Sequence, residues 1–169
     1  KSGFTEERPK PTSLLYVRNL DKGESLWATY EKVPSEWTLN YLGRDPQPPG
    51  MAQLKTLSSK YRTGFSYTGP APEKPIPGPT VEILTDTVVG DQRVVTLNIS
   101  HNREVNRLEV FTGDTPLYAA SVNEIDLTEY YLKNRRNGKL ITHYISGNEA
   151  TLLTLHFPPG QALDLTLYE

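Results

Sequence analysis

The sequence contains no cysteine among its 169 residues. Disulfide bonds and thiolate-ligated metal sites are therefore excluded. The sequence gives no information on whether the protein's compartment is oxidising or reducing. No apolar run approaches the ~20 residues that a membrane-spanning helix needs. The 18 basic and 20 acidic residues are interspersed and give a formal charge of −2, without the one-sided basic field of nucleic-acid-binding proteins. We expect no nucleic-acid partner and no membrane span in this segment.

Motifs for catalysis are also lacking. There is no Gly-x-Ser-x-Gly nucleophile turn and no Gly-rich phosphate loop. The three histidines, His101, His143 and His156, are far apart in sequence and include no close pair on one element, which zinc sites often use. We therefore expect the histidines to be structural, and we expect no catalytic residue, metal or cofactor in this segment.

The length is close to the commonest size of one domain. Because the chain begins at Lys1 with no initiator Met and no visible signal peptide, we expect it to be a segment of a longer protein. Residues 1–12 are polar and contain two prolines, and we expect a loosely ordered arm there. We expect residues 13–169 to form a single domain.

Most of the chain has the pattern of β-strands. Apolar Val95, Leu97 and Ile99 alternate with polar residues, which is the period of a half-buried strand. Short runs of this kind, separated by Gly, Asp, Asn or Pro turns, recur at 80–89, 93–100, 106–113, 116–123, 139–146, 150–157 and 162–169. This spacing predicts a mainly β fold, an antiparallel β-sandwich that is Ig-like or jelly-roll-like, with one or two short helices.

The N-terminal part predicts a hairpin followed by a helix. Runs 14–20 and 25–31 flank a turn that contains Gly23, which favours a β-hairpin. Ser35 is a suitable N-cap for a helix over 36–42, and Gly43 can end it in a left-handed conformation. Residues 126–134 predict either one helical turn or an irregular crossing.

Residues 69–79, which we call the proline-rich segment, hold five prolines. Spaced prolines keep an extended polyproline geometry of about 3.1 Å per residue, whereas flexible spacers are rich in Gly and Ser. This composition favours a rigid strap inside the single domain. A plain interdomain linker remains the alternative.

The aromatic residues offer the best candidates for a binding surface, because an open ring face can stack on a sugar or a peptide. The alternative for the two tryptophans is packing in the core between the hairpin and the helix. A basic turn at 134–139 offers a weaker candidate for anion contact, and an exposed turn is its ordinary interpretation. The candidate surface residues are Trp27, Trp37, Tyr130, Tyr131, Arg135 and Arg136.

The order of strand, turn and helix motifs near the N-terminus is distinctive. A strand with Leu-Tyr-Val (15–17) leads into an Asp-x-Gly-x turn (21–24) and then Leu-Trp-Ala-Thr-Tyr (26–30). Glu-Trp-Thr (36–38) then opens a helix that ends in Leu-Gly (42–43). This order resembles the soluble region that follows the membrane-spanning part of bacterial M28-family metallopeptidases, relatives of the vacuolar membrane proteases.

The resemblance implies a parent protein that is a membrane-anchored zinc aminopeptidase. In that family the chemistry belongs to an N-terminal domain that holds two zinc ions, and none of its motifs matches a position here. The resemblance thus implies a C-terminal domain on the periplasmic side of a bacterial membrane, with its parent's peptidase and membrane domains as partners. The leading hypothesis is a non-catalytic accessory domain that shapes substrate access, assembly or stability. A glycan- or peptide-binding module and an architectural or oligomerisation domain are the alternatives.

Overall fold

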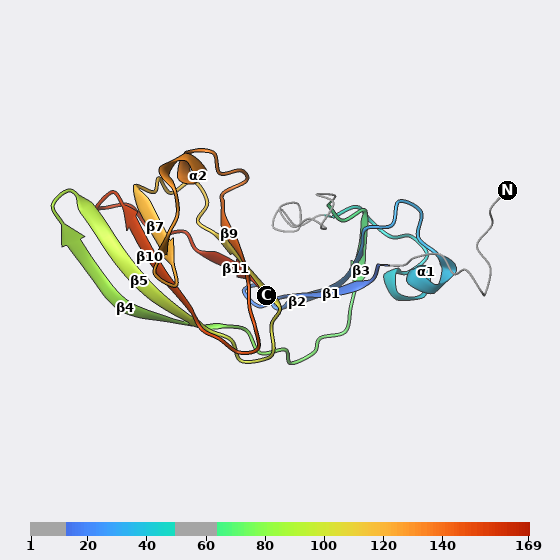
Figure 1. Ribbon diagram of the computed structural model, residues 1–169. Coiled ribbons are helices and arrows are strands. Elements are labelled where there is room, and N and C mark those ends of the chain that lie inside the picture. The colour runs from blue at the N-terminus through green and yellow to red at the C-terminus, as the bar shows by residue number, and fades with distance from the viewer. Residues whose placement is uncertain (1–12, 50–63) are drawn as a thin grey trace. The chain divides into compact units, whose positions relative to one another are not determined.

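The computed structural model describes residues 13–49 and 64–169, whose path is shown in Figure 1. The chain divides into two compact units, residues 1–76 (unit 1) and 77–169 (unit 2), with the boundary inside the proline-rich segment. Each unit has its own cluster of buried apolar side chains. The arm expected at 1–12 lies outside the described residues, and a single domain over 13–169 stays a prediction.

Unit 1 is a three-stranded antiparallel sheet in the order β1-β2-β3. Strands β1 (Leu15–Asn19) and β2 (Glu24–Thr29) form the predicted hairpin, and Gly23 in its turn has a φ of 66°. Strand β3 (Tyr67–Pro70) pairs with the other edge of β2. One face of this sheet holds a small apolar cluster in which Ala28 and Phe65 are buried.

Helix α1 (Glu36–Leu42) begins and ends where the sequence predicts. The Ser35 hydroxyl accepts a hydrogen bond from the Thr38 amide at 3.2 Å, and Gly43 closes the helix with a φ of 88°. The end of α1 lies directly over β3. A Cβ atom on Gly69 would run into the carbonyl group of Leu42, so the absence of a side chain lets the helix approach the strand.

Unit 2 contains two antiparallel sheets, seen on the left of Figure 1. The larger sheet has the order β4-β5-β10-β7-β8, formed by β4 (Thr80–Val89), β5 (Gln92–Ser100), β10 (Thr151–Phe157), β7 (Ala119–Val122) and β8 (Ile125–Asp126). The smaller sheet has the order β11-β6-β9, formed by β11 (Thr166–Tyr168), β6 (Arg107–Phe111) and β9 (Lys139–Tyr144).

The core of unit 2 lies between these sheets. Alternate residues of β5 and β10 are buried, as strand periodicity requires, and they join buried residues of β6, β7 and β9 in one cluster. Leu153, Leu155 and Phe157 on β10 are completely buried. The prediction of a mainly β, sandwich-like fold with two short helices is confirmed.

Several boundaries differ from the sequence prediction. The last run forms a strand only over 166–168, although Leu163 and Leu165 before it also pack against the core. Strand β8 was not predicted, because two residues carry no visible alternation. The region at 126–134 contains the one-turn helix α2 (Glu129–Lys133), with Thr128 as its N-cap. Neither helix of the described residues has the length or the apolar character needed to cross a membrane.

Neighbouring leucines on β10 allow a matched test of this core. Replacing completely buried Leu153 by Ala leaves a cavity between the sheets and is expected to lower the free energy of unfolding by about 2–5 kcal/mol. Leu152 lies on the opposite face and is only partly buried, so its replacement by Ala is expected to cost about 1 kcal/mol or less. Urea denaturation followed by far-UV circular dichroism measures both. Equal losses would contradict the assignment of faces.

Candidate functional site

Four aromatic side chains of unit 1 form a continuous set of ring contacts, which we call the aromatic row: Tyr16, Trp27, Tyr41 and Trp37. The ring centroids of Tyr16 and Trp27 are 5.3 Å apart, and those of Trp27 and Tyr41 are 5.2 Å apart, both edge-to-face. Tyr41 and Trp37 follow at 5.1 Å with tilted planes. These are favourable arrangements for aromatic pairs, each contributing about 0.5–1.5 kcal/mol beyond area burial.

The local structure explains why these rings meet. Tyr16 on β1 lies directly opposite Trp27 on β2, so both side chains project from the same face of the sheet. Trp37 and Tyr41 are four residues apart on α1 and therefore share one side of that helix. Gly69 lies opposite Trp27 on β3 and lets α1 approach, which brings the two pairs together.

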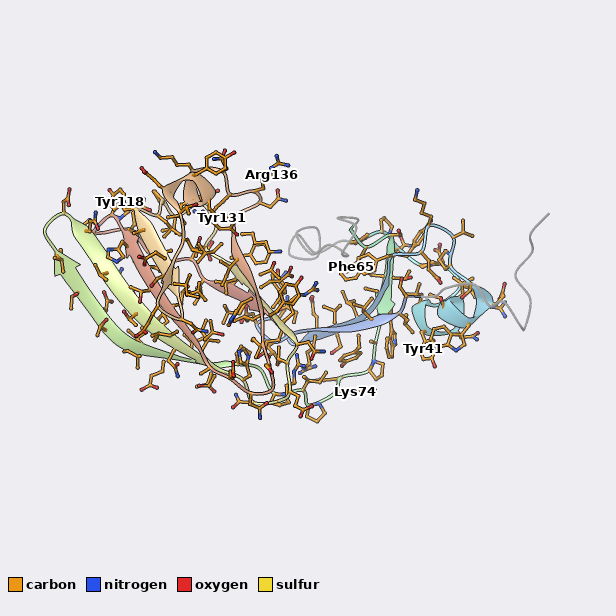
Figure 2. The ribbon with its side chains drawn as sticks, in the orientation of Figure 1. Tyr41, Phe65, Lys74, Tyr118, Tyr131 and Arg136 are labelled. Atoms are coloured by element: carbon orange, nitrogen blue, oxygen red, sulfur yellow. The ribbon has the colours of Figure 1, made fainter. Side chains whose placement is uncertain are left out.

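The first half of the proline-rich segment is fastened to the aromatic row. The Tyr16 hydroxyl donates a hydrogen bond to the Pro72 carbonyl at 2.7 Å and accepts one from the Lys74 amide at 2.9 Å. The Lys74 ammonium group lies 5.5 Å from the centroid of the Tyr16 ring and 5.9 Å from that of Trp27, within the range of a cation–π interaction. Figure 2 shows Tyr41 and Lys74 on one side of the sheet and Phe65 on the other.

Arg18 adds a second attachment beside the row. Its guanidinium group donates to the Ser25 hydroxyl at 2.9 Å and to the Glu73 carboxylate at 2.5 Å. The hydrogen bond to Glu73 raises the pKa of Arg18 further above its ordinary value. The Ala71 amide also donates to the Ser25 carbonyl at 3.0 Å. Residues 71–74 are thus held to the face of unit 1 by both backbone and side-chain contacts.

The row is only partly covered. Trp37 is 50% exposed and Tyr41 is 42% exposed, whereas Trp27 is mostly buried. The alternative in which both tryptophans are core residues is therefore wrong for Trp37. Its position on a seven-residue helix at the edge of a small sheet leaves its outer side without a covering element among the described residues.

The other candidate residues lie in unit 2, on and after α2. The Tyr131 hydroxyl donates to the Leu140 carbonyl at 2.6 Å, and burial raises the pKa of Tyr131. Arg135 donates to the Thr112 hydroxyl at 2.6 Å and to the Thr115 carbonyl at 3.2 Å. Burial lowers the pKa of Arg135 from its ordinary value. Tyr131 therefore joins α2 to β9, and Arg135 joins the segment after α2 to the loop that follows β6.

Tyr130 is 79% exposed and Tyr131 is 43% exposed. Arg136 is also exposed to solvent, as Figure 2 shows. A shallow, open depression of about 390 Å³ lies beside α2 and is lined by residues 113–116 together with Lys133 and Arg135. Since Lys133 forms an ion pair with Glu129 and Arg135 is bonded to Thr112, neither cation is presented alone to a ligand.

Each histidine has a hydrogen-bonding partner for its Nδ1 atom. His101 is paired with Glu169 at 2.6 Å, and both side chains are almost completely buried. His143 contacts the Thr151 hydroxyl at 3.1 Å, and His156 contacts Gln92 at 3.2 Å. Within 13–49 and 64–169, no three His, Asp or Glu side chains gather as metal ligands. The expected absence of a metal and of any cofactor stays a prediction.

Comparisons with protein-family models, with curated proteins and with solved structures give no match for this chain. The resemblance to the M28 region therefore depends on the residues described above. The structure joins Trp27 to Trp37 through Tyr41, and it places the other four candidates in the other unit. A binding role for these six residues stays a prediction.

The sequence interpretation did not select Tyr16 or Lys74 as site residues. The hairpin register would have found Tyr16, because a turn at 20–23 places it opposite Trp27. No sequence signal identifies Lys74, whose contacts depend on the path of the proline-rich segment across the sheet.

Single-tryptophan variants test the geometry of the row. With Trp27→Phe, the remaining Trp37 is expected to emit at longer wavelength and to be quenched readily by acrylamide, because half of its surface is exposed. With Trp37→Phe, the remaining Trp27 is expected to emit at shorter wavelength and to resist quenching. Circular dichroism verifies that each variant is folded. Equal shielding of both rings would contradict the structure.

Proposed function

We propose that this chain is a non-catalytic accessory part of a membrane-anchored, M28-like zinc aminopeptidase, located on the extracytoplasmic side of a bacterial membrane. In this role it shapes the substrate access, assembly or stability of its parent enzyme. Its partners are the peptidase and membrane domains of the same protein. The zinc belongs to the catalytic domain of the parent, and this chain supplies none of the catalytic residues.

One observation supports this proposal above the others. Several of the residues that carry the resemblance help to hold unit 1 together, whereas others, such as Leu15, Glu24 and Trp37, are exposed. Tyr16 and Trp27 begin the aromatic row, Ala28 is completely buried, and Leu42 is the point at which α1 meets β3. Gly43 then ends α1 with a φ of 88°, a backbone angle that favours glycine. A shared fold requires structural positions of this kind.

The purified chain alone tests whether the part is catalytic. It is expected to retain far less than one zinc ion per chain after dialysis, and to release no free amino acids from peptides. Atomic absorption and a ninhydrin assay measure these two results, with a zinc aminopeptidase as the positive control. Robust peptide hydrolysis by the isolated chain would contradict the proposal.

The same prediction extends to the parent enzyme. Removing this chain from the parent is expected to leave zinc content and dipeptide hydrolysis intact in the peptidase domain. The amount of folded enzyme, or its preference between short and long peptides, is expected to change. Loss of zinc without loss of folded protein would mean that the chain supplies metal ligands, and would overturn the proposal.

A second candidate function is binding of a glycan or peptide by the aromatic row. The exposed rings of Trp37 and Tyr41 favour it, because an exposed ring face is what stacking on a ligand uses. The neighbouring Lys74 adds a positive charge next to the rings.

This candidate predicts a specific effect of Trp37. Titration with soluble oligosaccharides and with extended peptides is expected to change tryptophan emission. Trp37→Ala is expected to weaken binding about fivefold, since one stacked ring is worth ~1 kcal/mol. Tyr130→Ala removes an even more exposed ring from unit 2 and is the control. Calorimetry measures the affinity of both variants. Equal affinity for the two variants would exclude the aromatic row.

A further inference from the structure

Residues 72–75 read Pro-Glu-Lys-Pro and form a Pro-x-x-Pro motif inside the proline-rich segment. The structure assigns neither helix nor strand to residues 71–79. Motifs of this kind favour the polyproline II conformation, whose backbone makes no internal hydrogen bonds and is free to bond with another surface. Domains that bind such motifs use grooves lined by aromatic side chains. In this chain the motif already lies against aromatic rings of unit 1.

Tyr16 binds the backbone of the motif. Its hydroxyl group donates to the Pro72 carbonyl at 2.7 Å and accepts from the Lys74 amide at 2.9 Å, so one phenol group holds the backbone on both sides of Glu73. The ring of Tyr16 is itself fixed by its edge-to-face contact with Trp27 on the neighbouring strand. The sheet therefore orders this hydrogen-bonding group independently of the motif, which lowers the entropic cost of binding.

Arg18 binds the acidic residue of the motif. Its side chain is only 13% exposed and is held by a hydrogen bond to the Ser25 hydroxyl at 2.9 Å. The side chain of Glu73, in contrast, is 70% exposed and reaches the guanidinium group from the surface. The cation is thus ordered by the sheet and the carboxylate is supplied by the motif. Because exposed ion pairs add little affinity, this contact serves mainly to select an acidic residue after the first proline.

The motif rests on the surface of unit 1 and takes no part in its buried cluster. Pro72, Glu73, Lys74 and Pro75 are all exposed, whereas the buried residues of that cluster are Ala28 and Phe65. Lys74 completes the contacts of the motif by placing its ammonium group over two rings of the aromatic row. Residues 72–75 are therefore bound to unit 1 as a peptide ligand would be, through backbone, carboxylate and ammonium groups.

We propose that Tyr16, Trp27 and Arg18 form a recognition site for Pro-x-x-Pro segments with an acidic residue after the first proline, and that residues 72–75 occupy this site as an intramolecular ligand. A partner protein that presents a segment of the same chemistry binds by displacing them. This proposal rests on the second candidate function, because it names the class of peptide that the aromatic row takes.

Occupation by the chain's own motif keeps the site closed to weak external ligands. A tethered segment acts at an effective concentration on the order of millimolar, with which a free peptide has to compete. The row also continues beyond the occupied rings, since Tyr41 contacts Trp27 and lies on the same side of the sheet as Lys74 (Figure 2). Tyr41 and Trp37 are 42% and 50% exposed, so a longer external segment finds ring surface that residues 72–75 leave open.

A variant without the internal motif tests the occupation of the site. The combined changes Pro72→Ser, Glu73→Ser and Pro75→Ser, which we call the released variant, alter three exposed positions. A fluorescein-labelled peptide with the sequence of residues 69–79 is the probe, and fluorescence anisotropy measures its affinity. The released variant is expected to bind this peptide at least tenfold more tightly than the unaltered chain, a difference of ~1.4 kcal/mol. Equal affinity, or no binding to the released variant, would overturn the proposal.

Tryptophan quenching checks the same displacement without a ligand. With Trp37→Phe, the remaining Trp27 is expected to be quenched more readily by acrylamide in the released variant, because Lys74 is no longer held over its ring. Circular dichroism verifies that each variant is folded. Unchanged quenching of Trp27 would mean that residues 72–75 do not occupy the site, and would overturn the proposal.

Charge reversal tests the selection of an acidic residue. In the released variant, Arg18→Glu is expected to weaken binding of the peptide about tenfold, and a peptide with lysine at the position of Glu73 is expected to restore it. Lys22→Glu reverses an exposed cation in the turn of the same hairpin and is expected to leave the affinity unchanged. Failure of the lysine peptide to restore binding would overturn the role of Arg18.

The outcomes also separate this inference from the proposed functions. Binding of an oligosaccharide that depends on Trp37, without peptide binding by the released variant, would keep the second candidate function and overturn this inference. Sedimentation identifies the chain to which the motif is bound, and a monomer is expected. A dimer that dissociates in the released variant would mean that the motif occupies a second copy, and would overturn its intramolecular binding.

Discussion

A sheet of five strands that faces a sheet of three cannot be covered across its whole width, and this constraint governs unit 2. On β5 and β10 the residues that face the smaller sheet are buried, among them Val95, Leu97 and Ile99 of β5. Burial stops abruptly at the next strand. Ile83 on β4 is 62% exposed, although its neighbour Leu97 on β5 is only 2% exposed. The core thus covers only one part of the larger sheet, and β4 lies beyond it with one edge that no strand of the described residues pairs with.

In unit 1, single residues each make two stabilising contacts. The Tyr16 ring packs against Trp27 while its hydroxyl group accepts one hydrogen bond and donates another to the proline-rich segment. Arg18 likewise joins β2 to that segment. In unit 2, Asn102 donates to the Gly78 carbonyl at 2.7 Å. The first part of the proline-rich segment is therefore bonded to unit 1, and its last part is bonded to unit 2. That the segment is a rigid strap inside a single domain stays a prediction.

Much of the fold follows from short-range signals in the sequence. The alternation around Val95 and Leu97 predicts β5, and the Ser35 cap predicts the first residue of α1, because both signals act within a few residues. Which strand joins which sheet is decided by distant contacts and was not predictable. The same limit applies to the candidate site, since Arg135 is held by Thr112 and Thr115, which lie far away in sequence. The exposure of Trp37 depends on where α1 ends relative to the sheet, which periodicity does not determine.

The close contact between Gly69 and Leu42 also constrains the sequences of related chains. It arises from the approach of a helix carbonyl group and not from a left-handed backbone, so no larger residue fits unless α1 moves away from β3. Any distant homologue that keeps the packing of α1 on β3 must keep glycine at the position equivalent to Gly69, immediately before its own equivalent of Pro70. Such a position stays invariant after the surrounding surface has diverged, and it offers an anchor for aligning chains whose overall identity is too low to align by itself.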